Sequence, residues 1–229
     1  MKTIGLIGGM SWESTRIYYE LINRDVQQRL GGLHSAKMLI ASLDMQHIAD
    51  LQNRAKWDEA GQLLVIEALH LQDAGAEVVA IAANTMHKCA PQVMAAISVP
   101  FLHIADALIV HLKAGGCSRP LLLATRFTME DNFYRDRLGA SGIDAMIPSA
   151  DDRVAMHDII YSELCKGIVT DVARRKIAAM INAAKADGAD SVILGCTEVC
   201  MVVDEKHSAL PVYDTAAIHA KALVDFSLS

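Results

Sequence analysis

The segment SVILGCTE, residues 191–198, places a thiol, a hydroxyl and a carboxylic acid directly after an apolar run. The run is typical of a buried strand that ends near Gly195, a residue that lets a ligand approach, so Cys196 is expected at the carboxyl end of the strand. A thiol beside the N–H groups of a following helix has a lowered pKa, and its thiolate can act as a base or a nucleophile. Cys196 is therefore the candidate catalytic residue, although a buried cysteine can equally be inert and Glu198 can simply stabilise a first helical turn.

A second polar motif, ANTMH at residues 83–87, follows another apolar run. Asn84 and Thr85 are residue types that commonly cap helices, and their side-chain and backbone groups can also hold a carboxylate. His87 is expected to be structural. The motif therefore fits either a helix cap or a binding site for a small acid.

The two motifs belong to an internal repeat. GAEVVAIAANT (75–85) aligns without gaps with GADSVILGCTE (188–198), about half a chain later. In this alignment Cys196 falls opposite Ala83, so one half carries a thiol where the other carries a methyl group. Because ligands of open α/β folds bind at the carboxyl ends of the strands, two facing halves would bring both motifs into one cleft.

Two further strand ends carry small or hydroxyl-bearing residues. GLIGGMSWEST (5–15) lacks the G-x-G-x-x-G pattern, which argues against a nicotinamide or flavin site. Its glycines instead allow the backbone N–H groups of Met10 and Ser11 to line a small pocket. ATRFTMED (124–131) ends the equivalent strand of the second half, so Thr125 and Thr128 either line the same pocket or cap a helix.

The composition excludes several classes of protein. Apolar residues make up 52% and charged residues 21% of the 229 residues, and the net charge of −6 argues against nucleic acid or an anionic membrane as the main partner. No apolar run approaches the roughly 18–20 residues that span a bilayer, and the N-terminus resembles a strand more than a signal peptide, so we expect a cytoplasmic protein. Five cysteines without a C-x-x-C pattern indicate free thiols and no zinc site.

Strand-like and helix-like segments alternate along the chain, which predicts an α/β fold. Continuous apolar strands indicate parallel sheets covered by helices on both faces. The strands are expected at residues 3–8, 37–43, 78–83, 100–104, 120–125, 145–148, 191–196 and 211–214.

The repeat divides the chain into two expected domains. One consists of residues 1–98 with 213–229, and the other of residues 99–212. A last helix from Thr215 is expected to return to the first domain, with an apolar face that carries Ile218, Ala222, Leu223 and Phe226.

Five motifs, in this order, resemble the aspartate/glutamate racemase family: IGLIGGMSWEST, ANTMHK, FLHIADA, GCTE and DTAAIHA. The resemblance covers essentially the whole chain and is closest to the bacterial amino-acid racemase branch. It implies two pseudo-symmetric α/β domains, each a mainly parallel sheet flanked by helices, with the active site in the cleft between them. It further implies a homodimer that uses neither pyridoxal phosphate nor a metal.

The resemblance also implies a mechanism with two cysteines. One removes the α-proton of an acidic amino acid and the other returns a proton to the opposite face, while N–H and hydroxyl donors stabilise the developing charge. Cys196 is one of the two acid/base residues. The implied substrate contacts are Met10, Gln52, Asn84, Thr85, Thr125, Thr197 and Lys166.

The sequence departs from the family where the second cysteine is expected. Position 83 is alanine, which has no proton to give or take, and Cys89 on the expected following helix is a poor substitute. We therefore predict a racemase-type enzyme for aspartate or glutamate that works with one base, stereospecifically or slowly. Two alternatives stay open: a homologue that binds a small acid without turnover, and another reaction of the superfamily, such as isomerisation of a diacid with Cys196 as a covalent nucleophile.

Overall fold

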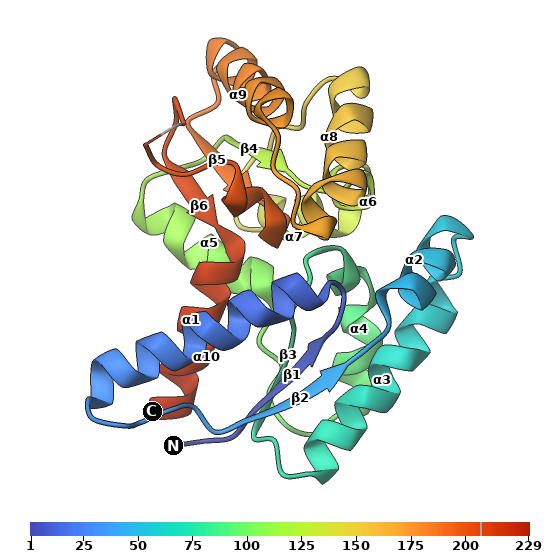
Figure 1. The fold of residues 1–229 in the computed structure, drawn as a ribbon, viewed down its shortest axis with the longest axis vertical. Coiled ribbons are helices and arrows are strands. Elements are labelled where there is room, and N and C mark those ends of the chain that lie inside the picture. Colours follow the sequence, from blue (N-terminus) through green and yellow to red (C-terminus); the bar gives the residue numbers. More distant parts are fainter. Residues whose placement is uncertain (207) are drawn as a thin grey trace. The chain divides into compact units, whose positions relative to one another are not determined.

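The structure, a computed structural model, describes residues 1–206 and 208–229. It has the α/β fold expected from the sequence, with two three-stranded parallel sheets flanked by helices (Figure 1). The chain divides into two compact units, Met1–Ile104 with His219–Ser229 and Ala105–Ile218. Both junctions lie a few residues later in the chain than the expected boundaries after residues 98 and 212.

The sheet of the first unit has the order β2–β1–β3, formed by Met38–Ser42, Ile4–Gly8 and Val78–Ile81. β1 and β3 consist of apolar and small residues and are buried along their whole length, as strands of a covered parallel sheet should be. A parallel bridge between Val79 and Phe101 extends the sheet beyond β3. The strand expected at residues 100–104 is thus reduced to a single bridged residue.

Helices cover both faces of this sheet. α1 (Trp12–Leu30) and most of α10 (Thr215–Leu228) lie on one face, and α3 (Trp57–Asp73) lies on the other (Figure 1). α1 begins after Ser11, whose hydroxyl accepts a hydrogen bond from the N–H of Ser14. The unit also contains α2 (Met45–Asn53), the 3₁₀ helix η1 (Thr85–Cys89) and α4 (Ala90–Ala96).

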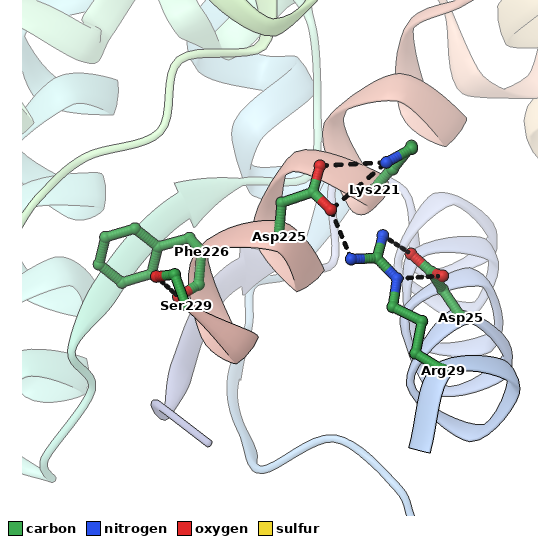
Figure 2. A network of polar contacts seen from close by, with 6 residues as sticks. All are labelled: Asp25, Arg29, Lys221, Asp225, Phe226 and Ser229. Carbon is green, nitrogen blue, oxygen red and sulfur yellow. Dashed lines mark hydrogen bonds and ion pairs between the residues drawn. The ribbon is translucent and has the colours of Figure 1, made fainter. Parts of the chain in front are cut away.

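The end of the C-terminal helix is bound to both α1 and the start of the chain. Arg29 of α1 forms ion pairs with Asp25 and Asp225 (Figure 2). The N–H of Lys2 donates to the carbonyl of Ser227 at 2.8 Å, and the two ends of the chain lie side by side (Figure 1). The last helix therefore packs with the beginning of the chain.

The sheet of the second unit has the order β4–β5–β6, formed by Pro120–Leu123, Ser191–Leu194 and Val212–Asp214. A parallel bridge between Leu121 and Met146 extends it beyond β4.

No helix among the described residues is long and apolar enough to cross a membrane. The remaining helices are α5 (Ile104–Ala114), α6 (Arg126–Glu130), α7 (Asn132–Gly139), α8 (Ala150–Ser162), η2 (Leu164–Lys166), α9 (Asp171–Ala186) and η3 (Thr197–Met201).

The two sheets reproduce the repeat found in the sequence. β3 and β5 cover equivalent residues of the two aligned segments, and a 3₁₀ helix follows each of them. β3 lies between β1 and Phe101, and β5 lies between β4 and β6, so the strand orders match. The chain leaves the first unit at Ile104, where α5 begins, and re-enters it at His219, near the start of α10.

The buried face of α10 differs from the predicted one. Ile218, Ala222 and Phe226 are only partly buried, whereas the buried residues are Thr215, Ala216, His219, Ala220, Leu223, Val224 and Ser227. His219 takes a core position because both ring nitrogens have hydrogen-bond partners, the hydroxyl of Tyr18 and the carbonyl of Leu102, each at 2.9 Å. Hydrophobicity alone could not predict this face, because the polar side chain of His219 lies at its centre.

Candidate active site

At the end of β5 a thiol, a hydroxyl and a carboxylate are in direct contact. Cys196 Sγ donates to Glu198 Oε2 at 2.9 Å, and Thr197 Oγ1 donates to the same oxygen at 2.8 Å. All three side chains are buried, and Glu198 is only 3% exposed. The backbone of Cys196 is still extended, and η3 then turns the chain so that Glu198 faces the thiol.

The environment of Cys196 keeps its side chain as a thiol. Burial raises the pKa of Cys196 well above its usual value, and the charge of Glu198 raises it further. The predicted lowering of this pKa by a following helix is therefore wrong. The reason is that η3 is only a short 3₁₀ helix, whose N–H groups are outweighed by burial and by the carboxylate. The proton of Cys196 instead points at a neighbouring base.

Replacing Glu198 with glutamine is expected to lower the pKa of Cys196, because a negative charge is lost while the thiol stays buried. A lower pKa increases the thiolate fraction at pH 8, so iodoacetamide should alkylate Cys196 faster than in the parent. The measurement is the rate of mass increase of the peptide that carries Cys196. Glu163→Gln, a change of the half-buried acid that precedes η2, is the matched control. An unchanged rate in Glu198→Gln would show that burial alone sets the pKa.

Gly195 is needed for the packing of the sheet, a role that its position at the strand end did not suggest. A Cβ atom at this residue would lie 2.8 Å from Leu122 Cδ1 and 3.0 Å from Ala124 Cβ. Its N–H donates to the carbonyl of Leu123 at 2.7 Å. Glycine is therefore required here because β4 and β5 approach closely.

Side chains from other elements surround this carboxylate, and no pattern in the sequence links them to it. Cys165 of η2 donates to Glu198 Oε1 at 3.7 Å, so each oxygen of Glu198 faces a thiol. Burial, followed by the charge of Glu198, raises the pKa of Cys165. Burial also raises the pKa of Tyr161 on α8, and the charges of Cys196, Cys165 and Glu198 add to the effect, so its phenol stays protonated. The ring of His157 packs on Tyr161 with centroids 4.6 Å apart.

One predicted substrate contact, Thr125, lies at the end of the strand next to β5. Leu123 of β4 pairs with Leu194 of β5, so Thr125 and Cys196 follow neighbouring strands. Thr125 is buried and caps α6, with its hydroxyl accepting from a backbone N–H of that helix at 3.4 Å. Lys166 is the last residue of η2 and is exposed.

In the first unit, the ends of β1 and β3 carry the other predicted residues. The N–H of Ala82 donates to the carbonyl of Ile7 at 2.8 Å, so the segments after these two strands begin side by side. Gln52 of α2 donates to Met86 Sδ at 3.1 Å, which brings α2 to the same place. The predicted residues at this edge of the sheet are all buried: Met10, Gln52, Ala83, Asn84 and Thr85.

The side chain of Asn84 does not cap the helix that follows it. Asn84 has helical backbone angles and makes no capping hydrogen bond to η1, although it is only 4% exposed. Capping therefore does not account for the choice of asparagine at this buried position. Its amide group remains a candidate to hold a carboxylate.

The position equivalent to Cys196 in the first unit holds only the methyl group of Ala83. The nearest cysteine along the chain, Cys89, donates to the carbonyl of Trp57 at 3.6 Å and so faces α3. Burial raises the pKa of Cys89 to about 11. Because its thiol faces α3, Cys89 is a poor replacement for the missing acid/base group.

These groups suit one kind of chemistry. A thiol hydrogen-bonded to a carboxylate can pass a proton, and buried amide and hydroxyl groups can stabilise a carboxylate that gains negative charge. Among residues 1–206 and 208–229, no three His, Cys, Asp or Glu side chains are grouped so that they could hold a metal ion. Two repeated α/β units with such strand ends agree with the architecture that the resemblance to the aspartate/glutamate racemase family implies.

Comparison with known proteins leads to the same class. The model of the Asp/Glu/Hydantoin racemase family matches residues 7–223, and the chain belongs to this family. It is 22% identical over 236 residues to the broad specificity amino-acid racemase RacX of Bacillus subtilis (strain 168), covering 99% of this chain and 98% of RacX.

Two solved structures cover the whole of both chains. A candidate Asp/Glu racemase from Yersinia pestis is 47% identical with a TM-score of 0.93, and an aspartate racemase homologue from Pyrococcus horikoshii OT3 is 29% identical with a TM-score of 0.85. The enzyme class is thus that of the racemases, which are isomerases.

Proposed function

We propose that this chain is a cofactor-independent enzyme that acts at the Cα of aspartate or glutamate, with Cys196 as its acid/base residue. The observation that carries the proposal is the buried thiol of Cys196, 2.9 Å from the buried carboxylate of Glu198 at a strand end. Membership of the racemase family and the 47% identity to a candidate Asp/Glu racemase support the choice of substrate.

The first step is the formation of a thiolate. The proton of Cys196 passes to Glu198, to which the thiol already donates. An amino-acid substrate brings a positive ammonium group, and a positive charge near a thiol lowers its pKa. Substrate binding would therefore offset part of the effect of Glu198, and the base would form only when the substrate is present.

The second step is the removal of the α-proton. The thiolate of Cys196 takes this proton, and the electron pair left on Cα spreads into the substrate carboxylate. Donors around that carboxylate stabilise the added charge. We assign this task to the predicted contacts Met10, Gln52, Asn84, Thr85, Thr125, Thr197 and Lys166.

The third step decides the stereochemical outcome. Once the thiol of Cys196 has exchanged its hydrogen with the solvent, it can return a hydrogen only to the face from which the α-proton was taken. Inversion needs a second donor on the opposite face, and Ala83 offers none. We therefore expect exchange of the α-proton with retention, and racemisation that is slow because water has to supply the second proton.

The experiment is proton NMR of L- and D-aspartate and of L- and D-glutamate with the enzyme in D₂O, followed by chiral analysis. Loss of the α-proton signal from one enantiomer, without change of configuration, is the expected result. Rapid inversion would contradict the one-base mechanism. Absence of exchange in all four compounds would overturn the proposed activity.

A second candidate function rests on Ala83 alone. Loss of one acid/base residue beside intact carboxylate-binding groups would also fit a protein that binds a small acid without turnover. Thermal stabilisation by aspartate or glutamate without any exchange in D₂O would favour this function. Exchange that depends on Cys196 would exclude it.

Three further properties stay predictions. We expect exchange of the α-proton to proceed without added pyridoxal phosphate, since a thiolate can remove the proton when donors stabilise the carbanion. The homodimer and the cytoplasmic location rest on the family resemblance and on the composition of the chain.

A further inference from the structure

Three buried histidines lie in the first unit around the segment through which the chain leaves it. His87, His103 and His219 are 1%, 5% and 0% exposed. The ring of His87 lies 4.5 Å from that of His103 and 5.9 Å from that of His219, measured between centroids. Burying three polar rings is costly unless their nitrogens are paired, so the partners of the rings indicate what they do.

The partners of His87 fix its tautomer. The N–H of Ile104 donates to His87 Nε2 at 3.2 Å, so this nitrogen carries no proton. Nδ1 then carries the proton and donates to the carbonyl of Ala83 at 2.8 Å. The neutral ring therefore bridges two backbone groups, one at the end of β3 and the other at the start of α5.

His219 binds the same segment at Leu102. A carbonyl can only accept, so Nε2 of His219 donates to the carbonyl of Leu102 at 2.9 Å. Nδ1 of the neutral ring then accepts from the hydroxyl of Tyr18 at 2.9 Å. His219 is itself the residue at which the chain re-enters the first unit. Both connections between the units are thus tied to the first unit through histidine rings.

We propose that His87 is a positioning residue, a strut that holds the backbone at Ala83 at a fixed distance from the first N–H of α5. The first N–H groups of a helix have no partner within the helix, and His87 supplies one for Ile104. The other end of the strut fixes the peptide that precedes Asn84 and Thr85. This inference rests on the proposed function, because it assigns to these two residues the binding of the substrate carboxylate.

Two substitutions separate the two ends of the strut. In His87→Gln the side-chain oxygen can replace Nε2 and accept from Ile104, whereas the bond to Ala83 is lost. In His87→Asn the amide N–H can replace Nδ1 and donate to Ala83, whereas the bond to Ile104 is lost. The two variants thus differ in which backbone group they release.

The expected results follow from that difference. His87→Asn should speed hydrogen exchange at the Ile104 amide about tenfold, and His87→Gln should leave it near the parent rate. His87→Gln should raise KM for the acidic substrate about tenfold with little change in kcat, because Asn84 and Thr85 lose their support. His87→Asn should change KM much less.

His111 provides the matched control, since its Nδ1 also lies 3.0 Å from the carbonyl four residues earlier, that of Ala107. His111→Gln and His111→Asn should change neither measurement. Equal exchange at Ile104 in the parent and in His87→Asn would overturn the proposal, as would equal rises of KM in both His87 variants. If no substrate is turned over, the proposed function fails, and amide exchange at Ile104 by itself supports or overturns the strut.

Discussion

Replacing Cys196 with serine is expected to abolish exchange of the α-proton, with a loss of at least about 10³-fold in rate. The hydroxyl has nearly the size of the thiol and can keep the hydrogen bond to Glu198, now 2.9 Å from Sγ. Its proton is far less acidic than that of a thiol, so no base forms at neutral pH. The measurement is the loss of the α-proton NMR signal in D₂O, with binding of the substrate followed by thermal stabilisation.

Two neighbouring cysteines are the controls for this substitution. Cys165 also donates to Glu198, and Cys200 donates to the carbonyl of Thr197 at 2.7 Å, where burial raises its pKa to about 12. Cys165→Ser and Cys200→Ser test whether any thiol in this cluster would serve, and we expect less than a tenfold loss in either. A loss in Cys165→Ser as large as in Cys196→Ser would place the base at Cys165.

The sequence predicts the position of Cys196 better than its chemistry. An apolar run that ends in glycine and cysteine is enough to predict the strand end, because burial of a parallel strand and its termination leave a clear local pattern. The pKa of the thiol depends instead on how deeply the strand end is buried and on the turn that brings Glu198 back to it. The sequence predicts a helix whose N–H groups lower the pKa of Cys196, whereas the chain forms only the short 3₁₀ helix η3.

Groups from distant segments could not be predicted for the same reason. Cys165 of η2 donates to Glu198, and Tyr161 of α8 lies close enough for the charge of Glu198 to raise its pKa. No pattern in the sequence signals either approach. The buried face of α10 was missed because His219 is polar, and its burial depends on Tyr18 and Leu102, which are far away in the chain. The spacing of apolar residues depends on local periodicity and can be seen in the sequence. The burial of a polar group depends on a hydrogen-bond partner from another part of the fold, which the sequence does not show.

The fold itself was largely predictable because both halves repeat one pattern. β3 and β5 begin and end at equivalent residues of the aligned segments, and each follows the same start of glycine, alanine and an acidic residue. The segments 100–104 and 145–148 were expected as strands but contribute only the bridged residues Phe101 and Met146.

Replacing Ala83 with cysteine is expected to convert slow or stereospecific exchange into racemisation, with a gain of roughly 10²-fold in the rate of inversion. Ala83 occupies the repeat position of Cys196 and lies beside Asn84 and Thr85, the proposed carboxylate contacts. A thiol there would supply the second acid that inversion needs. Chiral analysis of L-aspartate and L-glutamate incubated with the variant measures the gain directly.

The comparison among substitutions at this one position separates chemistry from packing. Ala83→Ser adds an atom of similar size but a much weaker acid, and Ala83→Thr adds a hydroxyl and a methyl group, so both should stay nearer to the parent than Ala83→Cys. Ala83 is 8% exposed, and all three variants must be shown to keep the unfolding midpoint. A folded Ala83→Cys variant without faster inversion would contradict the prediction that the ends of β3 and β5 act on one substrate. In that case Cys196 and Glu198, both at the end of β5, would have to be the only acid/base groups of the reaction.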